Sequence, residues 1–187
     1  MNHRFLYLSI CLLIFSCNSH VKNDNGKSTI RRIVFSTGPC LGYCPSLSID
    51  VDQNLNYKFY GDNNTKDTGF FQGTVTSYFW NKLTTQLEKS YFRKLSSEYR
   101  FGYTDIPSLE VVIYYDDEQK KIISGDWKSV PTELTKPLSW LENSYPYIDL
   151  QKVDTLIFET KLHQSFVRPD LYLKELEDSL KKREQIN

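Results

Sequence analysis

The chain has 187 residues, and its 23 lysines and arginines balance 23 aspartates and glutamates, so the formal net charge is zero. This length fits one domain of ordinary size and excludes an array of several domains. A zero net charge argues against a nucleic-acid partner, which a basic surplus would attract. Aromatic residues make up 14% of the chain, more than a disordered protein carries.

The first 17 residues predict an export signal. A short positive start ends at Arg4, an apolar run follows from Phe5 to Phe15, and Ser16 and Cys17 come directly after it. The eleven residues of this run would span about 16 Å as a helix, roughly half of a bilayer core, so the run is too short for a permanent transmembrane helix. It is typical of the apolar region of a secretory signal peptide.

The end of this run, over residues 14–17, resembles the lipobox of bacterial lipoproteins, with an aliphatic residue, a tolerant position, a small residue and then Cys17. The resemblance implies a signal peptide over residues 1–16, cleavage before Cys17, and acylation of the Cys17 sulfur, which anchors the protein in membrane lipid. An ordinary cleaved signal beside an incidental cysteine is the alternative. We expect the protein in the bacterial cell envelope, lipid-anchored to a membrane on the periplasmic or outer-membrane side.

Residues 17–29 are polar and contain glycine and several asparagines, which predicts a flexible tether between the lipid and the folded domain. Fully extended, its twelve residues after Cys17 would reach about 40 Å from the membrane.

After the tether, two kinds of hydrophobic period predict the elements of the fold. A period of two indicates strands, and apolar residues at i, i+3, i+4 and i+7 indicate helices. In chain order, the patterns predict a strand over 30–35, a hairpin over 46–60, a short strand over 69–75, a helix over 77–90, a hairpin over 109–126, a helix from about residue 131, a strand over 155–159 and a helix over 169–182. Thr76 or Ser77 is placed to cap the first helix, and Pro137 should kink or divide the second.

This order predicts an α+β fold: an antiparallel sheet of five to six strands with two helices packed on one face, plus a C-terminal helix. We expect the domain over residues 30–150 and a C-terminal extension over 151–187. In the extension, Leu173, Leu176 and Leu180 share one face of the predicted helix and should dock it on the domain.

The four cysteines reduce to one pair, because Cys11 lies in the predicted signal peptide and Cys17 is assigned to the lipid. Cys40 and Cys44 lie in a turn rich in glycine and proline, and in an oxidising compartment such a pair is expected to form a disulfide. A disulfide that closes so short a loop stabilises a fold by only about 2 kcal/mol. The Cys-x-x-x-Cys-Pro pattern also resembles that of Sco-type copper chaperones, so thiol redox chemistry or copper handling is the alternative.

The same turn, from Thr37 to Pro45, has the pattern Pro-Cys-x-Gly-x-Cys-Pro and is followed by an alternating hairpin. A Thr-Asp-x-Pro element stands later, at residues 104–107. Together these features resemble an uncharacterised bacterial domain family, domain of unknown function 6438, which is common on lipoproteins. The resemblance covers roughly residues 30–150 and implies no established activity.

A search for catalytic groups finds none of the common constellations. His20 and His163, the histidines beyond the signal peptide, both lie outside the predicted core, which argues against Ser-His-Asp and Cys-His chemistry and against a zinc site. The motifs of a nucleophile elbow and of a phosphate-binding loop are absent from the sequence. We therefore predict a protein that is not an enzyme and that holds no metal or other cofactor.

Asp105, Tyr103 and Tyr43 form the predicted functional surface. Asp105 either caps a local turn or acts beside the cysteine turn. Tyrosine-rich segments over 99–103 and 145–147 are explained either by strand packing or by ligand binding. We predict a membrane-anchored lipoprotein with a non-enzymatic binding or structural role, whose partners are membrane lipid and an envelope protein or glycan.

Overall fold

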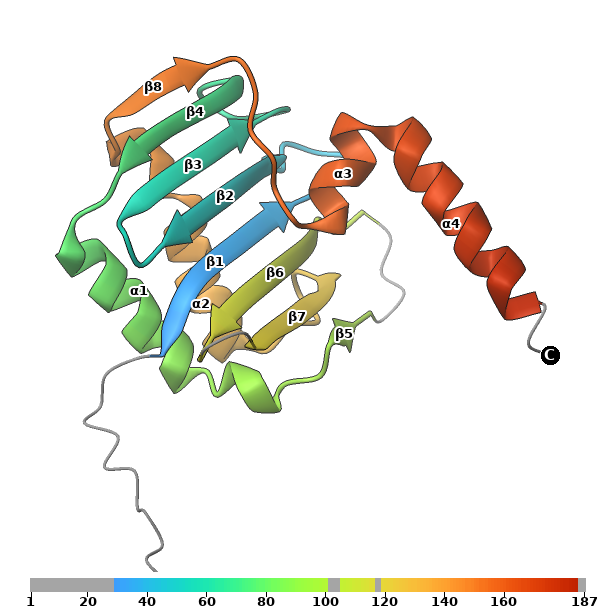
Figure 1. The fold of residues 1–187 in the computed structure, drawn as a ribbon, viewed down its shortest axis with the longest axis horizontal. Coiled ribbons are helices and arrows are strands. Elements are labelled where there is room, and N and C mark those ends of the chain that lie inside the picture. Colours follow the sequence, from blue (N-terminus) through green and yellow to red (C-terminus); the bar gives the residue numbers. More distant parts are fainter. Residues whose placement is uncertain (1–28, 101–104, 117–118, 185–187) are drawn as a thin grey trace, which may run out of the picture.

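The computed structural model describes residues 29–100, 105–116 and 119–184. One eight-stranded sheet forms its centre, in the order β5-β7-β6-β1-β2-β3-β4-β8 (Figure 1). The strands are β1 (Ile30–Thr37), β2 (Leu47–Asp52), β3 (Asn56–Gly61), β4 (Gly69–Thr74), β5 (Glu98–Tyr99), β6 (Ser108–Tyr115), β7 (Gln119–Asp126) and β8 (Leu150–Val153). The predicted signal peptide over residues 1–16, Cys17 and nearly all of the predicted tether lie outside the described residues.

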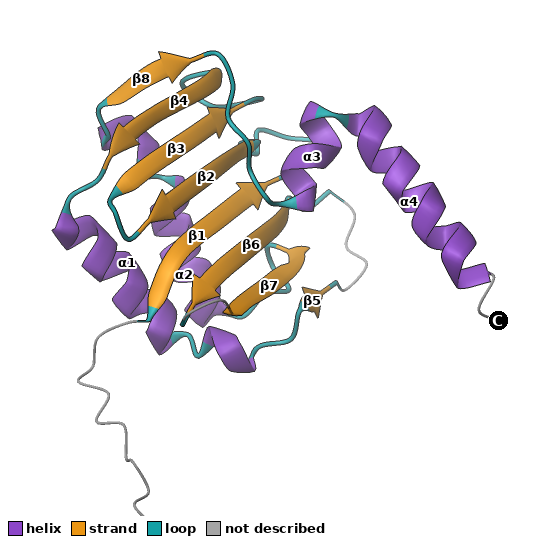
Figure 2. Ribbon diagram, viewed as in Figure 1, coloured by secondary structure: helices purple, strands orange, loops and turns teal. Residues whose placement is uncertain are grey.

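Two of the four described α-helices, α1 and α2, cover one face of this sheet (Figure 2). The helices are α1 (Ser77–Lys89), α2 (Thr132–Glu142), α3 (Lys161–Val167) and α4 (Pro169–Glu184), with short 3-10 helices η1 (Phe92–Lys94) and η2 (Tyr145–Tyr147). The main core lies between the sheet and α1 and α2. Its fully buried side chains include Ile33, Phe35, Ile49, Phe59, Val111 and Ile113 from the strands and Leu83, Leu87, Leu134, Leu138 and Leu141 from the helices.

The alternation of the strands produces this core. In β1, Ile33 and Phe35 point toward α1 and α2, and in β2 the partners Val51 and Ile49 do the same, because successive side chains of a strand face opposite sides. The predicted hairpin over 46–60 is confirmed as β2 and β3, and the hairpin over 109–126 as β6 and β7. The α+β class is therefore confirmed.

The sheet differs from the prediction in three respects. It has eight strands, where five to six were expected. Its edge strand β5 runs parallel to β7, so the sheet is not wholly antiparallel. At the other edge β8 pairs with β4, while the expected strand over 155–159 has no regular structure. β5 and β8 have two and four residues, too few for a periodic pattern to stand out in the sequence.

The first helix follows the prediction closely. The Oγ1 of Thr76 accepts a hydrogen bond from the backbone N–H of Phe79 and so caps α1. Pro137 does not divide the second helix, because α2 continues through it from Thr132 to Glu142. Pro137 is buried in the helix face that packs toward the sheet, together with Leu134 and Leu138.

The opposite face of the sheet is covered by the segment of residues 154–167, which we call the strap. It leaves β8, crosses in front of β4, β3 and β2, and ends in α3 (Figure 1). Phe158 of the strap is 1% exposed and packs against Val34 and Val112. Helices therefore cover both faces of the sheet, because α3 lies opposite α1 and α2.

The last helix, α4, forms where the sequence predicts one, but two leucines of its predicted docking face are exposed. Leu173 is 56% exposed and Leu180 is 50% exposed. In Figure 1, α4 extends from α3 away from the sheet. None of the described helices is long and apolar enough to cross a membrane.

Candidate functional site

The loop between β1 and β2, residues 38–46, contains both candidate cysteines, and we call it the cysteine loop. The sulfur atoms of Cys40 and Cys44 are bonded, with their Cα atoms 5.6 Å apart. The predicted disulfide is thus present and closes a short ring at the end of the sheet.

Hydrogen bonds hold the cysteine loop on both sides. The backbone N–H of Gly38 donates to the carbonyl oxygen of Ser108 at 2.9 Å, which ties the start of the loop to β6. The amide of Asn64 donates to the carbonyl oxygen of Cys44 at 3.2 Å, which ties its end to the loop between β3 and β4. The disulfide and these contacts restrict the conformations available to the loop.

Two large side chains project from the tip of the cysteine loop into solvent. Leu41 is 90% exposed and Tyr43 is 95% exposed. Single exposed hydrophobic residues are common on protein surfaces, but two of them on one restrained tip make a compact apolar surface.

Asp105 lies beside this tip, as expected if it acts beside the cysteine turn. Its Oδ1 accepts a hydrogen bond from the backbone N–H of Leu41 at 2.5 Å. Its φ angle is 66°, a left-handed conformation that aspartate adopts more readily than most residues. The structure therefore places Asp105, from the segment before β6, beside the loop that carries Tyr43, whereas Tyr103 lies outside the described residues.

The cysteine loop and the start of the described chain lie at opposite ends of β1. The strand begins at Ile30 and enters the loop after Thr37. Eight residues at a strand rise of about 3.3 Å separate the two ends by roughly 25 Å. A membrane anchor joined to the N-terminal side would therefore attach at the end of the sheet opposite the apolar tip.

A buried polar network joins the strap to the sheet. The Oγ of Ser36 lies 2.7 Å from the Oγ of Ser48 and 2.5 Å from the Oγ1 of Thr160. The Oγ of Ser48 lies 2.9 Å from the Nδ1 of His163. All four residues are buried, and His163 is 4% exposed.

The burial of His163 corrects the expectation that the histidines lie outside the core. The rings of Tyr60 and Phe158 pack on His163 with centroids 5.0 Å and 4.7 Å away. Burial lowers the pKa of His163 to about 4, so the ring is neutral at neutral pH. Only the fold shows this role, because the sequence pattern around residues 155–159 predicts a strand and gives no sign that His163 packs on the sheet.

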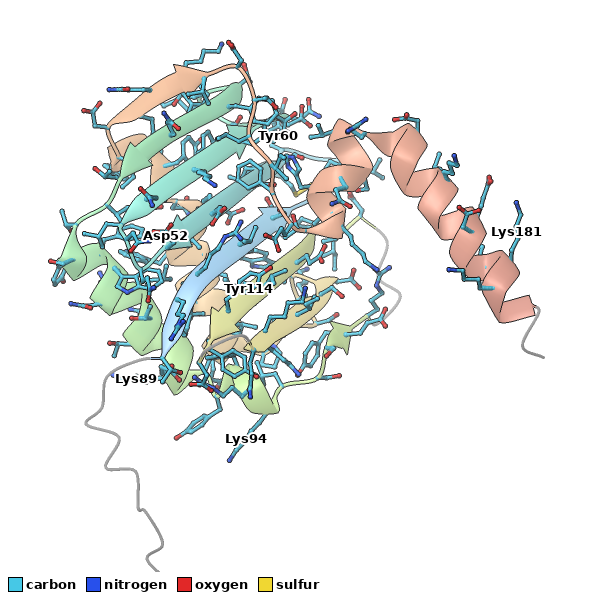
Figure 3. The ribbon with its side chains drawn as sticks, in the orientation of Figure 1. Asp52, Tyr60, Lys89, Lys94, Tyr114 and Lys181 are labelled. Atoms are coloured by element: carbon cyan, nitrogen blue, oxygen red, sulfur yellow. A yellow bond between two sulfur atoms is a disulfide. The ribbon has the colours of Figure 1, made fainter. Side chains whose placement is uncertain are left out.

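Charged and polar contacts on the same face also hold the strap at Glu159. The guanidinium of Arg32 donates to both carboxylate oxygens of Asp50, at 2.9 and 2.8 Å, and to Glu159 of the strap at 2.7 Å. The hydroxyl of Tyr114 also donates to Glu159. Figure 3 shows Tyr114 and Tyr60 on this face. The hydrogen bond from Tyr114 lowers the pKa of Glu159, and Arg32 adds to that effect.

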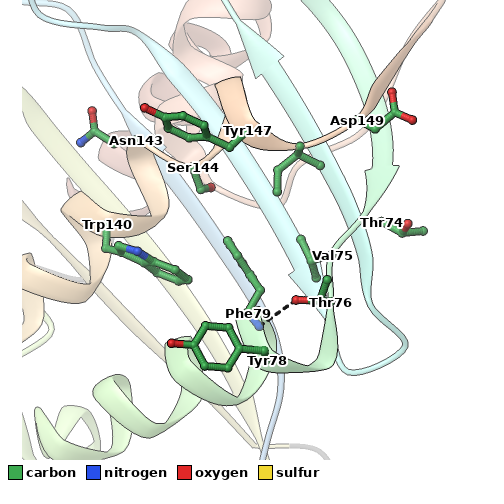
Figure 4. Close-up of a pocket in the computed structure, with 11 residues that line it drawn as sticks. Thr74, Val75, Thr76, Tyr78, Phe79, Trp140, Asn143, Ser144, Tyr147 and Asp149 are labelled. Carbon is green, nitrogen blue, oxygen red and sulfur yellow. Dashed lines mark hydrogen bonds between the residues drawn. The ribbon is translucent and has the colours of Figure 1, made fainter.

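A second candidate site is a groove on the other side of the molecule, where the start of α1 faces the end of α2 and η2. It has a volume of about 530 Å³. Six of its lining residues define it here, and we call it the aromatic groove: Tyr78, Phe79, Trp140, Asn143, Tyr147 and Asp149. Figure 4 shows the four aromatic rings around the opening, with Asn143 and Asp149 toward its two ends. The sequence singled out only the segment of Tyr147, because α1 supplies Tyr78 and Phe79 from a distant part of the chain.

Possible metal ligands do not gather in the described part of the chain: no group of three or more histidine, cysteine, aspartate or glutamate side chains lies within reach of one ion there. His163 directs its Nδ1 at Ser48.

Comparison with protein families places most of the chain in a known family. The family described as domain of unknown function (DUF6438) matches residues 31–145. Comparison with curated proteins finds no match.

Proposed function

We propose that this chain, which belongs to the DUF6438 family of domains of unknown function, is a lipid-anchored, non-enzymatic binding protein of the bacterial cell envelope. The apolar run before Cys17 supports export and acylation. The bond between Cys40 and Cys44 agrees with an oxidising compartment. In this proposal the tip of the cysteine loop contacts a partner protein of the envelope.

The observation that carries the proposal is the exposure of Leu41 and Tyr43 on a restrained loop. Side chains that are 90% and 95% exposed have most of their apolar surface still to bury against a partner. The disulfide and the hydrogen bond from Leu41 to Asp105 fix the tip before binding, so little conformational entropy is lost when a partner docks. Tyrosine is also among the residues that contribute most to protein interfaces.

The direction of β1 is consistent with this use of the loop. Because the chain enters β1 at the end opposite the cysteine loop, an anchor on Cys17 leaves the tip accessible to partners. A tip that pointed toward the anchor would instead favour contact with the bilayer.

Site-specific photo-crosslinking in living cells tests the proposed contact. A photoreactive phenylalanine analogue at position 43 should give one discrete adduct in the envelope fraction, and the adduct should disappear when Leu41→Ser is added. The matched control places the analogue at Tyr91, which is 69% exposed on another surface. Equal labelling from both positions, or no adduct from position 43, would contradict the proposal.

Fractionation of the same cells tests the anchor separately. The wild-type chain should sediment with membranes and carry label from a radioactive fatty acid. Cys17→Ser should lose the label and leave the membrane fraction. An unprocessed, unlabelled wild-type chain in the cytosol would overturn both the location and the anchor.

Thiol redox chemistry or copper handling is the second candidate, favoured by the partial exposure of Cys40 and Cys44. Titration of free thiols after mild reduction, followed by Cu(I) binding measured against a competing chelator, tests it. Rapid opening of the bridge and copper binding that Cys44→Ser abolishes would favour this candidate. A bridge that stays closed and no retained copper would leave the binding proposal in place.

A further inference from the structure

We propose that the aromatic groove is a saccharide-binding site, separate from the cysteine loop. A sugar ring has an apolar face of C–H groups and an edge of hydroxyl groups. A site for it therefore needs exposed aromatic faces beside hydrogen-bonding groups that have no partner in the protein. The aromatic groove offers both.

The floor of the groove is apolar and held in place. The rings of Phe79 and Trp140 lie 4.5 Å apart at an angle of 35°. The ammonium group of Lys82 lies 4.7 Å from the centroid of Trp140, and the ring of Tyr57 contacts Phe79 edge-on at 6.2 Å. Since these contacts come from the core and from α1, the floor is formed without a ligand.

Two tyrosine rings form the walls. Tyr78 is 73% exposed and Tyr147 is 88% exposed. They come from α1 and η2, and in Figure 4 they stand on opposite sides of the floor. A tyrosine ring contributes a large contact area and loses little conformational freedom on binding, because it has only two rotatable side-chain bonds.

Polar groups at the two ends of the groove supply the hydrogen bonds. The amide of Asn143 donates to the carbonyl oxygen of Ser139 at 2.7 Å, which orients its side chain and leaves its carbonyl oxygen available to a ligand. In the described part of the chain, the carboxylate of Asp149 and the hydroxyls of Tyr78 and Tyr147 make no hydrogen bond with the protein. A carboxylate that accepts from two adjacent hydroxyl groups fits a sugar.

The charge of the groove narrows the class of ligand. Among the described residues that line it, Asp149 is the one charged group, and the ammonium group of Lys82 lies close by, 4.7 Å from the ring of Trp140 and 6.0 Å from that of Tyr78, so the two opposite charges offset each other and favour a neutral ligand. A wholly apolar ligand would cover the polar groups of Asn143 and Asp149 without bonding them, which costs binding energy. The volume of about 530 Å³ lies within the usual range of small-ligand sites. A neutral oligosaccharide meets all three conditions.

NMR titration of the full chain in detergent micelles tests the proposal with two probes, tetra-N-acetylchitotetraose and cellotetraose. The chain has three tryptophans, and the indole N–H signal of Trp140, assigned with Trp140→Phe, should shift and saturate with at least one probe. The signal of Trp127, which packs against the core with its ring 6.0 Å from that of Phe35, should stay in place. Tyr147→Ala and Tyr78→Ala should each weaken binding by roughly 3- to 10-fold, the loss expected for one ring contact.

Tyr43→Ala is the matched control, because it removes an equally exposed tyrosine from the cysteine loop. It should leave saccharide binding unchanged, while Tyr147→Ala should leave the crosslink from position 43 unchanged. No shift of Trp140 with either probe, or a shift that Tyr147→Ala leaves intact, would overturn the saccharide site. A response to the tetrapeptide acetyl-Leu-Tyr-Phe-Leu-amide but to neither saccharide would identify the groove as a peptide site and overturn it equally.

Discussion

Acidification should destabilise this fold through His163. Its ring is buried between the sheet and the strap, where burial lowers its pKa from 6.5 to about 4. Below pH 6.5 His163 is protonated in the unfolded chain but stays neutral in the folded chain. The stability that the neutral ring contributes is therefore complete above pH 6.5 and is lost as the pH falls toward 4. At about 1.36 kcal/mol per pKa unit, the difference between pH 7 and pH 4.5 is about 2–3 kcal/mol.

Urea unfolding of the full chain in detergent, followed by tryptophan fluorescence at pH 7 and at pH 4.5, measures this loss. His163→Asn keeps a polar group beside Ser48 but does not titrate, so it should lose about 2–3 kcal/mol less than the wild-type chain between the two pH values. Other groups titrate equally in both chains and cancel in the comparison. An equal loss in the two chains would refute the attribution of this pH dependence to His163. An NMR titration of the His163 ring would show its pKa directly.

Three further predictions concern other contacts of the sheet. Arg32→Ala leaves the 3%-exposed carboxylate of Asp50 without its bidentate partner and should cost about 2–4 kcal/mol in urea unfolding. Burial raises the pKa of Glu142 to about 7, so the contribution of this carboxyl group to stability falls as the pH rises from 4.5 to 7, in the opposite direction to that of His163, and Glu142→Gln should raise the melting temperature at pH 8 but not at pH 4. A Cβ on Gly73 would lie 2.3 Å from the carbonyl oxygen of Asp149, so Gly73→Ala should separate β8 from β4 and speed amide hydrogen exchange in β8.

The centre of the fold could be predicted from the sequence, because hydrophobic periodicity is strongest where an element has one buried face. In β2, Ile49 and Val51 face the core at a period of two, and in α1 Leu83 and Leu87 do so at helical spacing. The cysteine loop was predictable for a different reason. The pair of cysteines between glycine and proline is a local signal that needs no tertiary contact to be read.

The parts that could not be predicted depend on contacts between distant segments. Thr160 and His163 are buried because the strap crosses the sheet, and nothing in their own neighbourhood indicates that position. The aromatic groove is likewise assembled from Tyr78 and Tyr147, which are far apart in the chain. Such sites follow from topology, which a hydrophobic pattern does not specify.

The boundary of the family match has a practical consequence for dissecting this protein. A fragment that stops at residue 145 would lack β8 and the strap, so β4 would present an unpaired edge and the side chains under Phe158 would be open to water. Such a piece is expected to self-associate through its bare edge. Expression of the family-matched region alone is therefore expected to yield aggregates, whereas a boundary placed after α3 retains both β8 and the strap.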